Sequence, residues 1–142
     1  AFYFHGPAYQ VLDQVGMVGS TVVGLMAGNL PANTSPSAAE TLMAPRLIEF
    51  CFQTAGIWEL ATTGAMALPM AIGRVTTYRQ PEQASGQRLF ALVTPVAGGT
   101  SFDAVVVDET GNVYVQMTGY QTVRMPGSVS ADLLAPLQAI LA

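Results

Sequence analysis

The sequence predicts an α+β fold in which one long apolar helix is enclosed by a curved antiparallel sheet. The first observation is the segment 43–58, MAPRLIEFCFQTAGIW, which has the composition of a helix that is hydrophobic nearly all round. A helix of this kind must be buried. The second observation is a run of strand-like segments after it, with a strong hairpin signal near its end. A sheet that curls around a single buried helix, the hot-dog architecture, satisfies both elements.

The elements before the helix are a strand and a loop. Residues 20–29, STVVGLMAGN, are rich in β-branched and small residues and predict a strand. The following stretch, NLPANTSPSAAE, contains the Pro, Asn and Ser residues that are typical of a loop. Within it, residues 37–40 (SAAE) match a capping box, which predicts a short helical turn.

The main helix is expected to run from about Ala44 to about Thr62. Pro45 falls in the first turn, where a proline is tolerated because its missing N–H has no partner there. Gly64 follows the last turn, where glycine commonly ends a helix. Both ends of the helix therefore carry a recognisable signal.

Strands are expected to form most of the remaining chain, over residues 65–80, 88–95, 102–108 and 112–124. Pro69 and Gly73 predict a bend or bulge in the first of them. The segment DETGN predicts a hairpin between the last two. Residues 131–141 predict a short closing helix, despite Pro136.

The last strand shows the alternation expected of a half-buried strand. Its apolar positions alternate with more polar ones for much of its length, so we expect one set to face the core. The apolar set is Val113, Val115, Met117 and Val123, and the other set is Tyr114, Gln116, Thr118 and Thr122.

Composition limits the classes of function. The 142 residues correspond to one domain and are 51% hydrophobic but only 10% charged, so we expect a partner domain or a second copy to cover apolar surface. The net charge of −4, the absence of Lys and the scattered Arg residues argue against nucleic-acid binding. No apolar run reaches the length of about 18 residues that a membrane span needs. Cys51, the single Cys, is expected to be a small buried hydrophobe in a reducing, cytoplasmic compartment.

The helix carries a carboxylate, Glu49, with an amide one turn later at Gln53. Residues four apart lie on the same helical face. An unpaired charge on so apolar a helix is heavily penalised, so Glu49 needs either a structural partner or a chemical role. Arg46 offers the structural alternative, because it lies three residues before Glu49 and can form an ion pair with it.

Other chemistry finds little support in the sequence. No spacing of His, Cys or carboxylates suggests a metal site, and GLMAGN lacks the strand–turn–helix context of a phosphate loop, so no cofactor is expected. The start, AFYFHGPAYQ, lacks the features of a signal peptide and opens without an initiator Met. We therefore expect a piece of a longer protein.

Two segments together resemble a known family. YFHGPAYQ at residues 3–10 resembles the Tyr-x-Tyr-Gly-Pro-x-Phe-Gln motif that opens the second hot dog of polyketide synthase dehydratase domains. PRLIEFCFQ at 45–53 resembles the Pro-x-Leu-Leu-Asp-x-x-x-Gln helix motif of the same half. Weaker echoes follow in the same order at 68–79 and 105–125. The resemblance leaves polyketide and polyunsaturated fatty acid synthases open as parents.

The resemblance implies one half of a double hot dog that removes water from a 3-hydroxyacyl chain on acyl carrier protein, giving the 2-enoyl product. Glu49 occupies the position of the family's catalytic Asp, and Gln53 that of the residue bonded to it. His5 replaces the second Tyr of the motif, as a hydrogen-bond donor or a surrogate base. Tyr3, Gly6 and Pro7 are expected to contact the phosphopantetheine-bound substrate.

The sequence departs from the family at two points. Glu49 is one methylene longer than Asp, a change that related single-hot-dog dehydratases tolerate. The family's catalytic His, which lies in a His-x-x-x-Gly-x-x-x-x-Pro motif of the first hot dog, has no counterpart here. The resemblance therefore implies that residues 1–142 are the acid-bearing second half of a dehydratase. This half would need an N-terminal hot dog, or a second copy in a homodimer, as its partner. A catalytically silent structural or docking hot dog and a hot-dog thioesterase remain alternatives.

Overall fold

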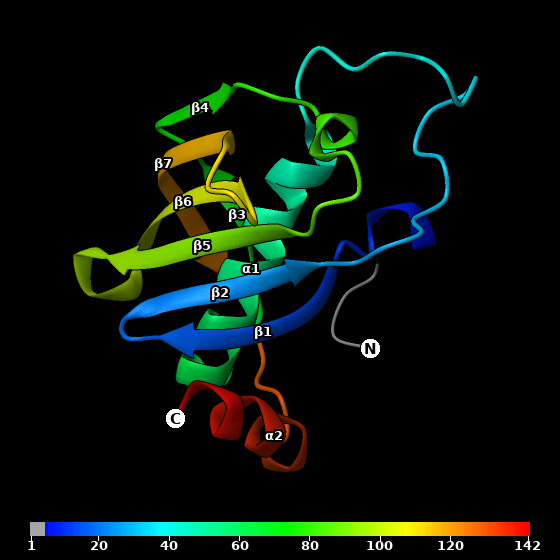
Figure 1. Cartoon of the computed structure of the whole chain (residues 1–142). Coiled ribbons are helices and arrows are strands. Elements are labelled where there is room, and N and C mark those ends of the chain that lie inside the picture. The colour runs from blue at the N-terminus through cyan, green and yellow to red at the C-terminus, as the bar shows by residue number, and fades with distance from the viewer. Residues whose placement is uncertain (1–4) are drawn as a thin grey trace.

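The computed structural model describes residues 5–142, and these residues form a curved antiparallel sheet around a central helix, α1 (Pro45–Thr63) (Figure 1). The strand order is β1-β2-β5-β6-β7-β3, and β4 pairs with β7 as well. The strands are β1 (Leu12–Val18), β2 (Thr21–Met26), β3 (Ala67–Ala71), β4 (Arg74–Thr77), β5 (Leu89–Val96), β6 (Ser101–Asp108) and β7 (Val113–Arg124). The remaining helical elements are α2 (Ala131–Leu141) and three short 3-10 turns, η1 (Pro7–Tyr9), η2 (Pro81–Ala84) and η3 (Ala97–Gly99).

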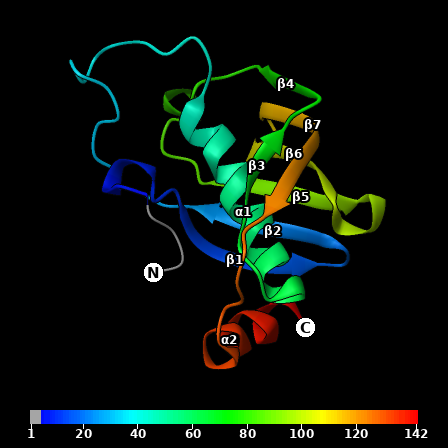
Figure 2. The same cartoon turned by 180° about the vertical axis from the view of Figure 1, so that it is seen from behind.

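The predicted α+β hot-dog fold is confirmed. Figure 2 shows α1 lying along the concave side of the sheet, with α2 beneath the C-terminal end of α1. Apolar side chains of α1 meet apolar side chains of the strands in one fully buried core. Its most buried members include Val22, Leu47, Phe50, Val93, Val106 and Met117, all at 0% exposure.

The signals at the ends of α1 are confirmed. Pro45 occupies the first turn, and Gly64 adopts a left-handed conformation (φ 71°) that returns its N–H to the carbonyl of Leu60. The short helical turn expected at 37–40 does not form. A single turn, in which the N–H of Ala39 donates to the carbonyl of Pro36, replaces it, and the chain is not helical at Glu40. The Glu side chain of the capping box therefore has no helix to cap.

Strand β1 is an element that sequence reasoning missed. It forms a hairpin with β2 around Gly19, whose φ of 59° suits the tight connection. Its apolar and polar residues do not alternate regularly, because the pairing register shifts between Leu12 and Gln14. This bulge removes the period-2 pattern on which recognition of a strand depends.

The expected facing of β7 is correct in its middle and wrong at its ends. Met117 and Val115 face the core as expected, but Tyr114, from the more polar set, is buried at 1% exposure. Val123, from the apolar set, is 49% exposed. The pairing with β6 shifts beside Gly119, which has a positive φ of 66°, so the residues beyond it change faces.

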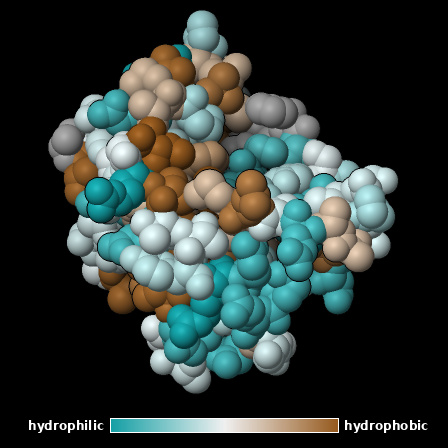
Figure 3. All heavy atoms as spheres, turned by 90° about the horizontal axis from the view of Figure 1, so that it is seen from above, coloured by the Kyte–Doolittle hydropathy of each residue, from teal (hydrophilic) through white to brown (hydrophobic). Residues whose placement is uncertain are grey.

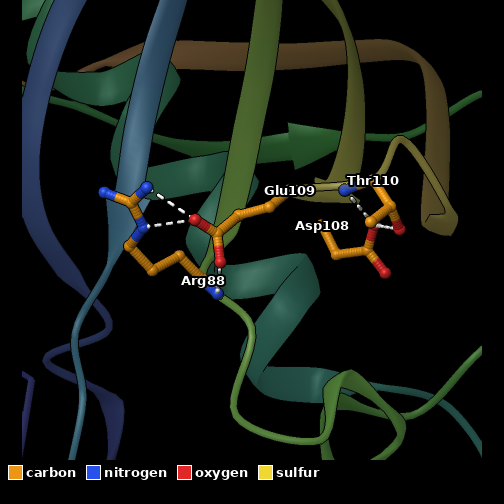
Figure 4. A network of polar contacts seen from close by, with 4 residues as sticks. All are labelled: Arg88, Asp108, Glu109 and Thr110. Carbon is orange, nitrogen blue, oxygen red and sulfur yellow. Dashed lines mark hydrogen bonds and ion pairs between the residues drawn. The ribbon is translucent and has the colours of Figure 1, made fainter.

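The β6–β7 hairpin is fastened by the carboxylate of Asp108, which is 4% exposed. It accepts hydrogen bonds from the backbone N–H groups and side chains of Thr110 and Asn112, and from the hydroxyl of Tyr114. Burial alone would raise the pKa of Asp108, but the hydrogen bonds from Asn112 and Thr110 together hold it well below its usual range. Figure 4 shows the contact of Asp108 with Thr110 beside the Arg88–Glu109 ion pair, which ties the start of β5 to the same turn.

Gly24 in β2 sets how closely α1 approaches the sheet. A Cβ at this position would collide with the hydroxyl of Thr54 and lie 3.1 Å from the ring of Phe50. Thr54 is itself fully buried and donates its hydroxyl to the carbonyl of Phe50 at 2.7 Å. Neither neighbour has room to move, because both belong to the packed face of α1.

We therefore expect Gly24→Ala to destabilise the fold by about 1–3 kcal/mol, the usual range for overpacking a core. Gly16→Ala is the matched control, because Gly16 lies in the adjacent strand and an added Cβ there meets nothing within 4 Å. Urea unfolding of both variants measures the difference in the free energy of unfolding. Equal stability of the two variants would contradict the close approach at Gly24.

Candidate active site

Helix α1 brings Glu49 and Gln53 together one turn apart, as their spacing predicts. The amide nitrogen of Gln53 donates to Oε1 of Glu49 at 3.0 Å and to the backbone carbonyl of Tyr9 at 2.7 Å. Gln53 is only 3% exposed, so its amide is fixed by these contacts. It therefore orients the carboxyl group of Glu49 and ties it to the N-terminal segment.

His5 completes this cluster. Its Nε2 lies 2.9 Å from Oε1 of Glu49, and both side chains are about one-fifth exposed, at 20% and 19%. A proton can pass directly between the two groups at this distance. The structure thus brings the proposed acid, its orienting amide and the chain's only imidazole into a single contact network.

Two other expected substrate-binding residues lie beside the cluster rather than in it. Gly6 and Pro7 are exposed and begin the η1 turn, in which the N–H of Tyr9 donates to the carbonyl of Gly6 at 2.9 Å. That turn presents the Tyr9 carbonyl to Gln53, so the Gly-Pro pair supports the site through the backbone. Tyr3, the third expected contact, lies outside the described residues.

Arg46 does not form the structural ion pair with Glu49 that its spacing allows. Its guanidinium donates instead to the backbone carbonyl of Ala8, through Nε at 3.0 Å, and to that of Pro31. Arg46 therefore fastens the first turn of α1 to η1 and to the loop before the helix. Glu49 has His5 and Gln53 as its partners.

The surroundings of Glu49 favour its protonated form. Burial raises the pKa of this carboxyl, and the hydrogen bond from Gln53 and the charge of His5 offset that rise only in part. A carboxyl with a raised pKa keeps its proton to a higher pH than an exposed carboxyl does, and it can donate that proton to a leaving group.

A second buried carboxylate on the same helix was missed by sequence reasoning. Glu59 is 6% exposed, and the hydroxyl of Thr122 lies 2.9 Å from each of its oxygens. Burial raises the pKa of Glu59 as well, against the opposing effects of Thr122 and Arg124. The available signal was its place within the expected helix, Ala44 to Thr62, one residue beyond the apolar segment 43–58.

The cluster opens into two spaces. A small cavity of about 50 Å³ is lined by both carboxylates, together with His5, Gln53 and Thr122. A groove of about 610 Å³ begins at His5 and Gln53 and continues between β1 and α2. A further cavity of about 570 Å³, beside η2 and the loop before α1, includes none of the clustered residues.

Other candidate chemistry is limited within residues 5–142. No three His, Cys, Asp or Glu side chains of these residues lie close enough together to hold a metal ion. Burial raises the pKa of the Cys51 thiol to about 12, so its thiolate is not available as a nucleophile. Neither helix of this part of the chain is long and apolar enough to cross a membrane.

The fold and this cluster define a hot-dog protein with a carboxyl–amide–imidazole site. Residues 1–132 match the family model described as the polyketide synthase dehydratase N-terminal domain, and the chain belongs to this dehydratase family. Because that description names an N-terminal domain, the placement in the second hot dog stays a prediction. A search of curated proteins found no significant match.

Solved structures show the same fold. The dehydratase domain from the CurF module of curacin polyketide synthase is 21% identical with a TM-score of 0.67, and the match covers 85% of this chain and 42% of that one. The corresponding domain from the CurK module is 22% identical with a TM-score of 0.65, covering 90% and 43%. An inactive Asp-to-Asn mutant of the CurK dehydratase is 20% identical with a TM-score of 0.64, covering 87% and 43%. The chain thus spans less than half the length of the domains it matches.

The raised pKa of Glu49 predicts a pH-dependent change in stability. The folded state binds this proton more tightly than the unfolded state, so the ionised carboxylate lowers stability as the pH rises above its ordinary pKa of 4.5. We expect Glu49→Gln, which mimics the neutral form, to be more stable than the parent sequence at neutral pH and to lose this advantage at pH values below 4.5. Urea unfolding across this range measures the difference, and an advantage that grows on acidification would contradict the assignment.

Proposed function

We propose that the chain is the acid-bearing half of a dehydratase that converts 3-hydroxyacyl thioesters on acyl carrier protein into 2-enoyl thioesters. The observation that carries the proposal is the carboxyl of Glu49, which has a raised pKa, is oriented by Gln53 and contacts His5 at 2.9 Å. Membership of the polyketide synthase dehydratase family supports the reaction class.

The reaction moves two protons. A base removes the proton from C2, the C3–O bond breaks, and the C2–C3 double bond forms, while Glu49 gives its proton to the departing hydroxyl, which leaves as water. Each such proton transfer is worth about 10²–10⁴-fold in rate. Before the next turnover the base must lose its proton and Glu49 must regain one. His5, at 2.9 Å, is the group through which the carboxyl can regain it.

The base is assigned to a partner hot dog. Two mutants of the CurK dehydratase described as inactive, one His-to-Phe and one Asp-to-Asn, support a pair of His and carboxyl groups as the machinery of that relative. In this chain Glu49 takes the carboxyl role. We assign His5 a positioning and proton-holding role, because it contacts Glu49 directly from the same chain.

Exposed apolar side chains support a partner. Met70, Ile72, Val123 and Met125 lie at or near the paired strands β3 and β7 and are between 38% and 58% exposed. Figure 3 shows that apolar side chains gather into patches on the upper face of the molecule rather than being spread evenly. An N-terminal hot dog, or a second copy in a homodimer, would cover apolar surface of this kind.

We expect Glu49→Gln to lower kcat for dehydration by at least about 10²-fold in the full-length protein that carries this chain, because the amide cannot donate an acidic proton. Circular dichroism and thermal unfolding should show an intact fold. Glu40→Gln is the control, because Glu40 is exposed and lies before α1. Near-parental dehydration by Glu49→Gln would remove Glu49 from the acid role.

We also expect the isolated chain to leave a 3-hydroxyacyl thioester unchanged, because the His-x-x-x-Gly-x-x-x-x-Pro motif is absent from it. Mass spectrometry of the incubated thioester measures the enoyl product and free acid separately. Enoyl product that disappears in His5→Phe would make His5 the base and contradict its positioning role. Release of free acid by the chain alone would favour a thioesterase.

A further inference from the structure

The groove that begins at the site is lined in part by aliphatic side chains. It runs from His5 and Gln53 between β1 and α2, and its volume is about 610 Å³. This volume lies within the range of about 300–1,000 Å³ that is typical of small-molecule sites. Its aliphatic lining consists of Leu12, Val15, Ile57, Leu137 and Ile140. Its polar lining consists of His5, Gln53 and the exposed residues Gln10, Asp13 and Gln14.

Helix α2 is a fixed wall of this groove. The amide of Gln138 donates to the carbonyl of Ala61 at 3.1 Å, and Leu134 is buried near Gly64, close to the end of α1. Leu137 and Ile140 are three residues apart, so they share one face of α2. Figures 1 and 2 both show α2 beneath α1 and near β1, the strand that supplies the opposite wall.

The position and lining of the groove indicate which part of a substrate it could hold. His5 and Gln53 line both the groove and the small cavity at Glu49, so a substrate whose C3 hydroxyl reaches Glu49 has one end at the mouth of the groove. A pantetheine arm carries amides, and those that lay against the five aliphatic side chains would be left without partners. A hydrocarbon tail needs no such partners and gains from leaving water.

We propose that this groove binds the hydrocarbon tail of the acyl substrate, so that the site takes medium-length alkyl 3-hydroxyacyl thioesters in preference to short or heavily oxygenated ones. The inference rests on the proposed dehydratase function. Leu137 and Ile140 on α2, with Ile57 on α1, are the residues that determine the preferred tail. The exposed side chains of Asp13 and Gln14 stay in water at the rim.

Binding of 3-hydroxyacyl-pantetheine thioesters, from 3-hydroxybutyryl to 3-hydroxydodecanoyl, tests the proposal by calorimetry. The series uses the Glu49→Gln variant, in which turnover is expected to be slowed at least about 10²-fold. Each methylene that enters the groove should strengthen binding by about fourfold until the groove is full, as the free energy of burying one methylene implies. Affinity that does not change with tail length would overturn the proposal.

Two substitutions on α2 locate the effect. Leu137→Trp fills the groove and should weaken binding of the longest thioester at least tenfold, leaving 3-hydroxybutyryl binding unchanged. Ala135→Trp is the matched control, because Ala135 is exposed and two residues away, on another face of the same helix. Leu137→Ala introduces no clash and should extend the preference to longer or bulkier tails.

Three other outcomes are distinguishable. Equal weakening of short and long thioesters by Leu137→Trp would overturn the groove assignment. A change in self-association, measured by light scattering, without any change in acyl binding would identify the groove as a protein interface and overturn it too. Binding could depend on tail length while the Glu49→Gln variant keeps the parental dehydration rate. That result would support the groove assignment and contradict only the proposed function.

Discussion

The burial of α1 inside the curved sheet determines what every other part of the structure can do. One face of the helix packs on the strands so closely that Gly24 has no room for a Cβ against Thr54 and Phe50. That contact fixes the depth and rotation of α1 against the sheet. It thereby also fixes the positions of the side chains on the other faces of the helix. Glu49 is therefore held where its side chain is only partly exposed, at 19%, and Gln53 where it is almost fully buried, at 3%. The same burial that stabilises the fold raises the pKa of the carboxyl group.

The site also depends on a short chain of contacts that crosses from the helix to the N-terminal segment. The Tyr9 carbonyl holds the amide of Gln53, and the amide holds Glu49, which in turn contacts His5. Arg46 reinforces the same junction by donating to the carbonyls of Ala8 and Pro31. The two segments that resemble dehydratase motifs are thus in direct contact in the fold.

The sequence was sufficient for the helix and most strands because their signals are local. Pro45, Gly64 and the DETGN turn act through the backbone of neighbouring residues, which tertiary packing leaves unchanged. Strand β1 and the ends of β7 could not be predicted, because bulges between paired strands decide which residues face the core. The contact of Glu49 with Gln53 could be predicted because both residues lie on one helix, four positions apart. The contacts of His5 with Glu49 and of Thr122 with Glu59 could not, because they join segments that are distant in the sequence.

The two carboxylates of α1 differ in what surrounds them, and this difference argues for Glu49 as the reacting group. Both have a raised pKa caused by burial. Glu59 is 6% exposed, and the hydroxyl of Thr122 holds both of its oxygens beside the cavity of about 50 Å³ that the two carboxylates share. Glu49 is less enclosed, with 19% of its side chain exposed, and it contacts His5, which also lines the groove of about 610 Å³. A buried acid serves catalysis only where its proton can be replaced, and the proposed role of Glu49 therefore depends on its contact with His5, which has no equivalent among the contacts described for Glu59.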